Sequence, residues 1–302
     1  MTSSIAFLGA GLMGTPMIRR LLAAGYDVRV WNRSRAKLAP LLAEGASIAE
    51  SPGDAVRSVD LVCLCLTDAD AVEAVLFGDD ASAAAAMTPG SLIVDFSTIG
   101  PERTRAIARR LSKQRAITWV DAPVSGGVKG ATDGQLVIMC GGTDHDIERA
   151  RPVMELLSKR ISHVGPLGSG QAAKLCNQLI VATNVVAIAE ALALAGANGL
   201  DPRKLPSALA DGWADSLPLQ IIGTRMASGT MDPPIVSIGT FAKDLSLVLK
   251  NTPDPLQLTS AASAIYAQAD AMGIASADVT MLRDVIENQT PNWLARARRS
   301  PE

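Results

Sequence analysis

The feature that most constrains the fold is a glycine pattern near the amino terminus, between a strand-like run and a helical pattern. Residues 5–8 are apolar throughout, and Gly9, Gly11 and Gly14 follow them with the spacing G-x-G-x-x-G. An amphipathic pattern begins directly afterwards, as it does where the first strand of a dinucleotide-binding fold turns into its first helix. The N–H groups at the start of that helix are suited to a pyrophosphate. The turn residues expected to hold it are Gly9, Gly11, Leu12, Met13 and Gly14.

Short apolar runs alternate with helical patterns as far as about residue 165. Continuous apolar runs of this kind are typical of parallel strands that are buried on both faces of a sheet. The runs expected to form strands are 5–8, 28–31, 61–66, 92–95, 117–120 and 136–139. The sequence therefore predicts a Rossmann-type, doubly wound and largely parallel α/β domain over residues 1–165.

Beyond residue 165 the strand-like runs stop, and the patterns are helical, with glycine or proline at the breaks. The helices expected here span residues 170–198, 202–211, 217–227, 241–250, 255–272 and 278–287. The sequence therefore predicts an all-α C-terminal domain over residues 166–302, which begins with a long interdomain helix.

The long helix expected at 170–198 is apolar around more of its circumference than the surface helix of a monomer needs. Thr183, Asn184 and Glu190 interrupt the apolar run. Such residues are costly against lipid and ordinary against protein. We therefore expect a helix buried against protein, no membrane span, and a homodimer or homotetramer that covers part of this helix.

The charge balance argues for a small-molecule partner. A net charge of -2 gives no field that would gather nucleic acid or anionic lipid, so a few local cations must capture any anionic ligand. The amino terminus lacks the basic flank and cleavage site of a secretory signal, and we expect a cytoplasmic protein. No metal site is expected, because none of the following residues has a metal-ligand spacing: Cys63, Cys65, Cys140, Cys176, His145 and His163.

The end of the second expected strand indicates which dinucleotide binds. An acidic residue at this position usually holds the ribose 2′-hydroxyl of NAD. This chain has Asn32, Arg33 and Ser34 there instead. A carboxylate would repel a 2′-phosphate, whereas an amide, a guanidinium and a hydroxyl can all hydrogen-bond to it. We therefore predict NADP(H) as the cofactor, with these three residues around its 2′-phosphate.

Elimination leaves a lysine as the strongest acid–base candidate. Neither Tyr26 nor Tyr266 is followed by a lysine four residues later, which excludes a Tyr-x-x-x-Lys catalytic pair. The two histidines lie just outside apolar runs, where a surface role is commoner than catalysis. Lys174 begins the long helix, and Asn177 lies on the same face three residues later. The residues alone leave Lys174 either a solvated helix-start lysine or a catalytic group in a cleft.

Four segments, in order along the chain, resemble successive signatures of the β-hydroxyacid dehydrogenase family. They are 7–14 (FLGAGLMG), 121–127 (DAPVSGG), 168–177 (GSGQAAKLCN) and 241–245 (FAKDL). This family includes 3-hydroxyisobutyrate dehydrogenase and tartronate semialdehyde reductase, and the resemblance spans nearly the whole chain. It implies hydride transfer between the cofactor and a small 3-hydroxy acid or its semialdehyde.

The resemblance also implies which residues handle the substrate. Ser125, Gly126 and Gly127 would bind its carboxylate, partly through backbone N–H groups, which suit an anion. Lys174 would be the catalytic acid–base, and Asn177 would hydrogen-bond to the substrate.

Two more residues are implied at the cofactor. Thr98 belongs to a Ser-Thr-x-x-Pro turn at 97–101 and would lie near the nicotinamide end. Lys243 would reach the cofactor or the active site from the second domain, and Asp244 beside it is expected to orient its neighbours rather than to react.

The substrate is indicated by weaker features. Residues 212–220 resemble the corresponding part of tartronate semialdehyde reductases, and an NADP-type turn suits a reductive role. We therefore expect reduction of 2-hydroxy-3-oxopropionate with Lys174 as general acid; 3-hydroxyisobutyrate, serine and threonate are the alternatives. Imine reductases and a non-catalytic cofactor-binding interaction module share the architecture, and Lys174 argues against both. Because an ordinary lysine is protonated at neutral pH, reduction should work near neutrality and oxidation should rise toward alkaline pH.

Overall fold

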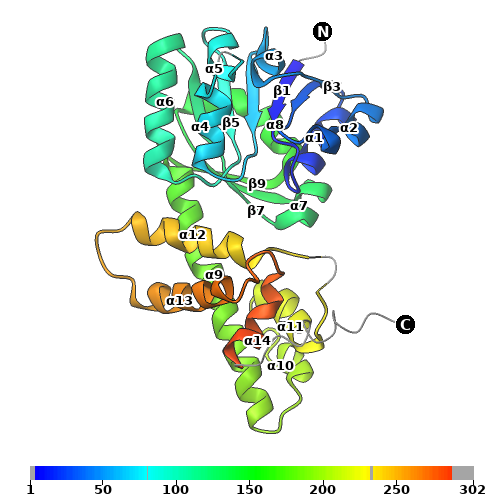
Figure 1. The fold of residues 1–302 in the computed structure, drawn as a ribbon, viewed down its shortest axis with the longest axis vertical. Helices are drawn as coiled ribbons and strands as arrows, with labels where there is room; N and C mark the ends of the chain where they lie inside the picture. Colours follow the sequence, from blue (N-terminus) through cyan, green and yellow to red (C-terminus); the bar gives the residue numbers. More distant parts are fainter. Residues whose placement is uncertain (1–3, 80, 232–233, 288–302) are drawn as a thin grey trace. The chain divides into compact units, whose positions relative to one another are not determined.

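The computed structural model describes residues 4–79, 81–231 and 234–287. The chain forms two compact units, Met1–Lys174 and Leu175–Glu302 (Figure 1). The division falls later than the one expected after residue 165. The reason is local: the first turn of the long helix is hydrogen-bonded to Asp121 at the end of a strand in the first unit.

The first unit is built on one sheet in the order β3-β2-β1-β4-β5-β6-β8-β7, with β9 paired to β8. The strands from β3 through β6 are parallel, as expected of a doubly wound domain. The strands are β1 (Ser4–Leu8), β2 (Asp27–Trp31), β3 (Ser47–Ile48), β4 (Leu61–Leu64), β5 (Leu92–Asp95), β6 (Thr118–Asp121), β7 (Val124–Ser125), β8 (Leu136–Gly141) and β9 (Ser158–Gly165). Each of the six expected runs contributes a strand, and the predicted fold class is confirmed.

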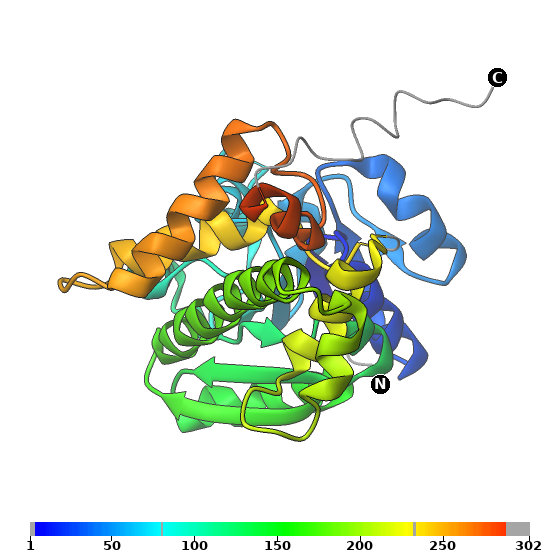
Figure 2. The same ribbon diagram turned by 90° about the horizontal axis from the view of Figure 1, so that it is seen from below.

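The far end of the sheet differs from a simple parallel pattern. Strand β8 is antiparallel to both β6 and β7. Only the ten residues 126–135 separate β7 from β8, which is too few for the crossover that a parallel pair requires. Strand β9 was not expected, because it has no continuous apolar run: all of its residues are half-buried or exposed, and it includes the exposed pair Lys159 and Arg160. Figure 2 shows β8 and β9 as neighbouring green strands.

Successive strand residues point to opposite faces of the sheet, and each face has its own apolar core. In β1, Phe7 packs into one core and Leu8 into the other. The Phe7 face is covered by α1 (Gly14–Ala23), α2 (Ala39–Ala43), α7 (Gly127–Asp133) and α8 (Asp144–Leu157). The Leu8 face is covered by α3 (Pro52–Val56), α4 (Ala69–Phe77), α5 (Ala83–Ala86) and α6 (Pro101–Arg115). Full burial of such side chains stabilises the fold by about 1.5–3 kcal/mol each.

In its described residues the second unit consists of helices joined by turns and loops, with an isolated bridge between Ser237 and Asp278. Tyr266 is fully buried in its core, where its hydroxyl donates to the Ala182 carbonyl at 3.1 Å and its ring meets Phe241 edge-on. Helices α12 and α13 lie side by side (Figure 1). The helices are α9 (Ser169–Ala197), which starts in the first unit, η2 (Pro202–Lys204), α10 (Leu205–Ala208), η3 (Leu219–Gly223), α11 (Thr224–Ser228), α12 (Ile238–Lys250), α13 (Gln257–Ala271), η4 (Val279–Met281) and α14 (Leu282–Ile286).

Candidate active site

The glycine turn lies where the sheet order reverses, between the carboxyl ends of β1 and β4. The two outer glycines and the middle glycine have different surroundings. A Cβ atom on Gly9 would lie 2.3 Å from the Cys65 carbonyl oxygen, and one on Gly14 would lie 1.9 Å from the Gly9 carbonyl oxygen. A Cβ atom on Gly11 would meet nothing within 4 Å. Tight packing at the outer glycines and open space at the middle one are what a pyrophosphate approaching the backbone requires.

The N-terminus of α1 is also suited to an anion. Met13 precedes the helix and makes no side-chain cap, and the first turn contains no acidic residue. Leu12 is 80% exposed, so the turn reaches solvent. The N–H groups at this helix end can therefore turn to a phosphate, and the residues present fit a dinucleotide.

Asn32 has partners other than the expected 2′-phosphate. Its side-chain oxygen accepts from the Ala10 N–H at 3.0 Å, and its amide nitrogen donates to the Ser34 carbonyl at 2.9 Å. The Asn32 side chain thereby connects the glycine turn to the residues that follow β2. Arg33 is exposed and makes no hydrogen bond or ion pair with the described residues, whereas Arg35 is bound by Glu50. Arg33 is thus the guanidinium at this turn that can meet a phosphate.

The segment expected to bind a carboxylate joins β7 to α7. Gly126 and Gly127 have φ angles of 129° and 62°, a region that glycine adopts without strain. Both glycines are exposed, Ser125 is half-buried, and no side chain caps the start of α7. The loop therefore presents backbone N–H groups and a hydroxyl, which together suit an anionic group.

The turn that contains Thr98 follows β5. Ser97 Oγ accepts from the Leu66 N–H at 2.9 Å and so ties this turn to the end of β4. Thr98 itself is half-buried. The Thr98 turn and the glycine turn therefore follow β5 and β1, which lie on either side of β4.

Lys174 lies in the second turn of α9 and is 8% exposed. A solvated lysine at the start of a helix would be far more exposed, so its burial favours the catalytic interpretation. Asn177 follows three residues later on the same face of the helix.

In the second unit a chain of contacts joins α9 to α12. Asn177 Nδ2 donates to Gln178 Oε1 at 2.8 Å, and Gln178 in turn donates to Asp244 Oδ2. Lys243 Nζ lies 3.3 Å from Asp244 Oδ1, an ion-pair distance without hydrogen-bond geometry. Since Asp244 is only 2% exposed, this carboxylate is placed to orient Gln178 and Lys243.

Known protein families match both parts of the chain. Residues 4–165 match the NAD binding domain of 6-phosphogluconate dehydrogenase, and residues 168–286 match the NAD-binding domain of NADP-dependent 3-hydroxyisobutyrate dehydrogenase. The chain belongs to the 3-hydroxyisobutyrate dehydrogenase family. The resemblance seen in its sequence segments is thereby confirmed. The protein is an oxidoreductase of the 3-hydroxyacid dehydrogenase type that uses a nicotinamide dinucleotide.

Relatives within this family carry different substrate names. The chain is 39% identical over 251 residues to the 2-hydroxy-3-oxopropionate reductase of Escherichia coli, covering 82% of this chain and 83% of that protein. It is 42% identical over 201 residues to the NAD-dependent L-serine dehydrogenase of Pseudomonas aeruginosa, covering 67% of each. The solved 3-hydroxyisobutyrate dehydrogenase of Mycobacterium tuberculosis with L-serine aligns with a TM-score of 0.85 at 32% identity, over 95% of this chain and 99% of that one.

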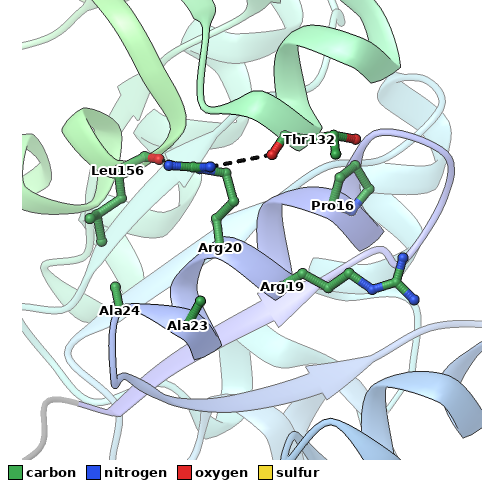
Figure 3. Close-up of a pocket in the computed structure, with 7 residues that line it drawn as sticks. All are labelled: Pro16, Arg19, Arg20, Ala23, Ala24, Thr132 and Leu156. Carbon is green, nitrogen blue, oxygen red and sulfur yellow. Dashed lines mark hydrogen bonds between the residues drawn. The ribbon is translucent and has the colours of Figure 1, made fainter.

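A pocket of about 460 Å³ in this dehydrogenase lies along α1, between that helix and the segments around Thr132 and Leu156 (Figure 3). Its two cations already have acceptors. Arg20 donates to the Leu156 and Thr132 carbonyls at 2.6 and 3.3 Å, and Arg19 pairs with Glu44 at 2.8 Å. We interpret this pocket as the contact of α1 with its neighbours and not as a ligand site.

Two buried carboxyls near these turns were missed in the sequence. Burial raises the pKa of Asp95 to about 7, although hydrogen bonds from Ser97 oppose the shift. Burial also raises the pKa of Asp121 to about 6, against backbone hydrogen bonds from Gly168 and Gln171. An acidic residue ending each of two adjacent, otherwise apolar strands was the available signal. Among the described residues no cluster of histidine, cysteine or acidic side chains could hold a metal ion.

Proposed function

We propose that this protein reduces 2-hydroxy-3-oxopropionate with NADPH and that Lys174 is the general acid. The observation that carries the proposal is the buried Lys174 near the start of α9, in a chain 39% identical to a 2-hydroxy-3-oxopropionate reductase. A buried lysine needs a partner or a task, because taking its charge out of water is costly.

The chemistry divides between the cofactor and the protein. When bound, NADPH supplies the hydride for the aldehyde carbon. The Lys174 ammonium donates a proton to the aldehyde oxygen as negative charge develops on it. Ser125 and the N–H groups of Gly126 and Gly127 hold the carboxylate, and Asn177 hydrogen-bonds to the substrate. In the reverse direction Lys174 must first lose its proton, so oxidation rises toward alkaline pH while reduction works near neutrality.

A second candidate is the oxidation of 3-hydroxyisobutyrate or L-serine, which the names of other relatives favour. A panel of 2-hydroxy-3-oxopropionate, methylmalonate semialdehyde, 3-hydroxyisobutyrate, L-serine and threonate, each assayed with both cofactors, separates the candidates. We expect the highest kcat/KM for 2-hydroxy-3-oxopropionate with NADPH. A higher value for L-serine or 3-hydroxyisobutyrate would replace our proposal with the second candidate.

The proposed preference for NADPH rests on Arg33. This guanidinium is exposed at the end of β2, and no acidic side chain stands beside it at positions 32 or 34 to repel a 2′-phosphate. Arg33→Asp should therefore reverse the ratio of kcat/KM for NADPH and NADH, by about 10-fold or more if the ion pair is worth at least 1.4 kcal/mol. Arg109→Asp, on the exposed surface of α6, is the matched control and should keep the ratio. An unchanged ratio in Arg33→Asp would contradict this assignment.

We also propose that a second copy of this chain covers part of α9. Ile180, Ala187 and Leu194 are exposed and lie seven residues apart, so they form one apolar stripe along the helix. Ile180 and Leu194 are 63% and 66% exposed, values that are costly for large aliphatic side chains on an unpartnered surface. A symmetric pairing of two such stripes would bury both.

A further inference from the structure

The start of α9 is held by a side chain from another element. Gly168 precedes the helix and has no side chain with which to cap it. Instead Asp121, at the end of β6, accepts from the Gly168 N–H through Oδ1 and from the Gln171 N–H through Oδ2, both at 2.7 Å. These are donors that a helix would otherwise leave unsatisfied. Asp121 is fully buried, so water does not compete for these bonds.

The start of α9 packs closely against the backbone of the neighbouring strands. A Cβ atom on Gly141 would lie 2.7 Å from both Asp121 Oδ1 and the Pro166 carbonyl oxygen. A Cβ atom on Gly170 would lie 2.5 Å from the Met139 carbonyl oxygen. The first turn of α9 therefore rests directly on the ends of β6 and β8.

Gln171 connects the same turn of α9 to the turn that contains Thr98. Its Oε1 accepts from the N–H groups of Ile99 and Gly100 at 2.9 and 3.0 Å. Its Nε2 donates to the Ser97 carbonyl at 2.8 Å. These three bonds bracket Thr98 from both sides, and the Gln171 side chain is fully buried.

Lys174 follows Gln171 by three residues on the same helix, so the two side chains leave α9 on one face. Asp121 fixes the helix start, and Gln171 fixes the Thr98 turn to that start. We propose that Asp121 and Gln171 are positioning residues that set the Lys174 ammonium relative to the Thr98 turn. This proposal rests on the proposed role of Lys174 as proton donor. A catalytic group displaced by about 1 Å can lose roughly 10²-fold in rate, which sets the scale of the expected effect.

Gln171→Met tests the proposal, because it keeps the side-chain length and removes all three hydrogen bonds. We expect kcat to fall by about 10- to 100-fold, while the Kd for NADPH measured by fluorescence titration changes less than about threefold. The matched control is Thr183→Val, which removes a hydroxyl whose acceptors among the described residues are carbonyls of its own helix, those of Leu179 and Ile180. This control should keep the wild-type kcat.

A double-mutant cycle with Lys174→Ala shows whether Gln171 acts through the lysine. We expect Gln171→Met to add little to the residual single-turnover rate of Lys174→Ala. The same 10- to 100-fold loss in that background, or a wild-type kcat for Gln171→Met alone, would overturn the positioning role. If instead Lys174→Ala keeps most of its activity, the proposed function fails and not merely the positioning role.

Gln171→Glu gives a second readout if Gln171→Met does not fold. A protonated carboxyl can still accept from Ile99 and Gly100 and donate to the Ser97 carbonyl, whereas an ionised one repels that carbonyl. The other titratable or charged groups nearby are Asp121 on β6, Asp95 on β5, Arg105 on α6 and Lys174 on α9. We expect kcat of this variant, divided by that of the wild type, to fall as pH rises from 5.5 to 8. A ratio independent of pH would contradict the proposal.

Discussion

At the residue scale, the side chains with the clearest tasks are buried charged groups. Lys174, Asp95, Asp121 and Asp244 each lie at or below 8% exposure, which charged residues reach only with partners or a function. The sequence singled out Lys174 by elimination of other acid–base groups and by its family-like segment, and Asp244 by its family-like segment. It did not reveal that Asp121 holds the start of α9. The two N–H groups that donate to this carboxylate are 47 and 50 residues away in the chain, and no local pattern indicates them.

The proposed proton donor gives the first prediction. Lys174→Ala should lower kcat by about 10²- to 10⁴-fold, the usual contribution of a general acid, because the variant lacks the ammonium that donates the proton. The Kd for NADPH should change little, since the glycine turn and Arg33 are untouched. Steady-state kinetics and a fluorescence titration measure the two quantities. Lys113→Ala, on the exposed last turn of α6, is the control and should behave as wild type.

Asp95 gives a prediction about stability. Its pKa rises from 3.8 to about 7 on folding, so the folded state binds this proton more tightly than the unfolded state. The resulting stabilisation is complete below about pH 3.8 and is lost as pH rises to about 7, at up to about 1.4 kcal/mol per pH unit. Asp95→Asn keeps the acceptor for the Ser97 N–H and removes the charge from Oδ2, which has no hydrogen-bond partner among the described residues.

Thermal unfolding of the cofactor-free protein tests this. The Tm of Asp95→Asn should exceed that of the wild type at pH 8, and the difference should shrink toward pH 5, where the wild-type carboxyl is protonated. The exposed Asp254→Asn should show no such trend. A constant difference across this pH range would mean that Asp95 does not titrate as described.

At the element scale, the agreement between sequence and structure follows from burial. Strands covered on both faces have continuous apolar runs, so β1, β4 and β5 were predictable from those runs in the sequence. In β2 the buried Val28 and Val30 alternate with half-buried residues. Strand β9 is exposed along much of its length and has no such run, and β7 has only two residues. The boundary between the units, at Lys174, was also not visible in a local pattern. The first turn of α9 is held by Asp121 on β6, which is distant in the sequence and comes close only in the folded chain.

The junction of β1 and α1 gives a prediction that separates packing from ligand contact. Gly14→Ala places a methyl group 1.9 Å from the Gly9 carbonyl oxygen, which forces α1 away from the turn. We expect a loss of about 1–3 kcal/mol in stability, as for other overpacked sites, and weaker NADPH binding. Gly11→Ala meets nothing within 4 Å, so it should keep the Tm and weaken only NADPH binding. Equal Tm values for the two variants would contradict these roles.

At the scale of the whole molecule, local charge and not net charge governs ligand capture. The chain carries a net charge of -2, yet its candidate site residues include Arg33, Lys174 and Lys243. The apolar stripe on α9 bears on how whole molecules associate, because its large side chains Ile180 and Leu194 are exposed. By length and composition alone this helix could cross a membrane, and 39% of its most apolar window is buried. Thr183, Asn184 and Glu190 on the helix favour a protein partner over lipid.

The last prediction therefore concerns the oligomeric state. If a second copy covers the stripe, Ile180→Glu combined with Leu194→Glu should place four carboxylates in a paired interface and lower the oligomeric state, because unpaired buried charges cost several kcal/mol. Size-exclusion chromatography with light scattering at several concentrations measures the mass. Leu258→Glu, which is 71% exposed on α13 and off the stripe, should leave the mass unchanged. A wild type that is monomeric at all concentrations would remove the second copy as the partner, and sedimentation with lipid vesicles would then show whether lipid covers the helix instead.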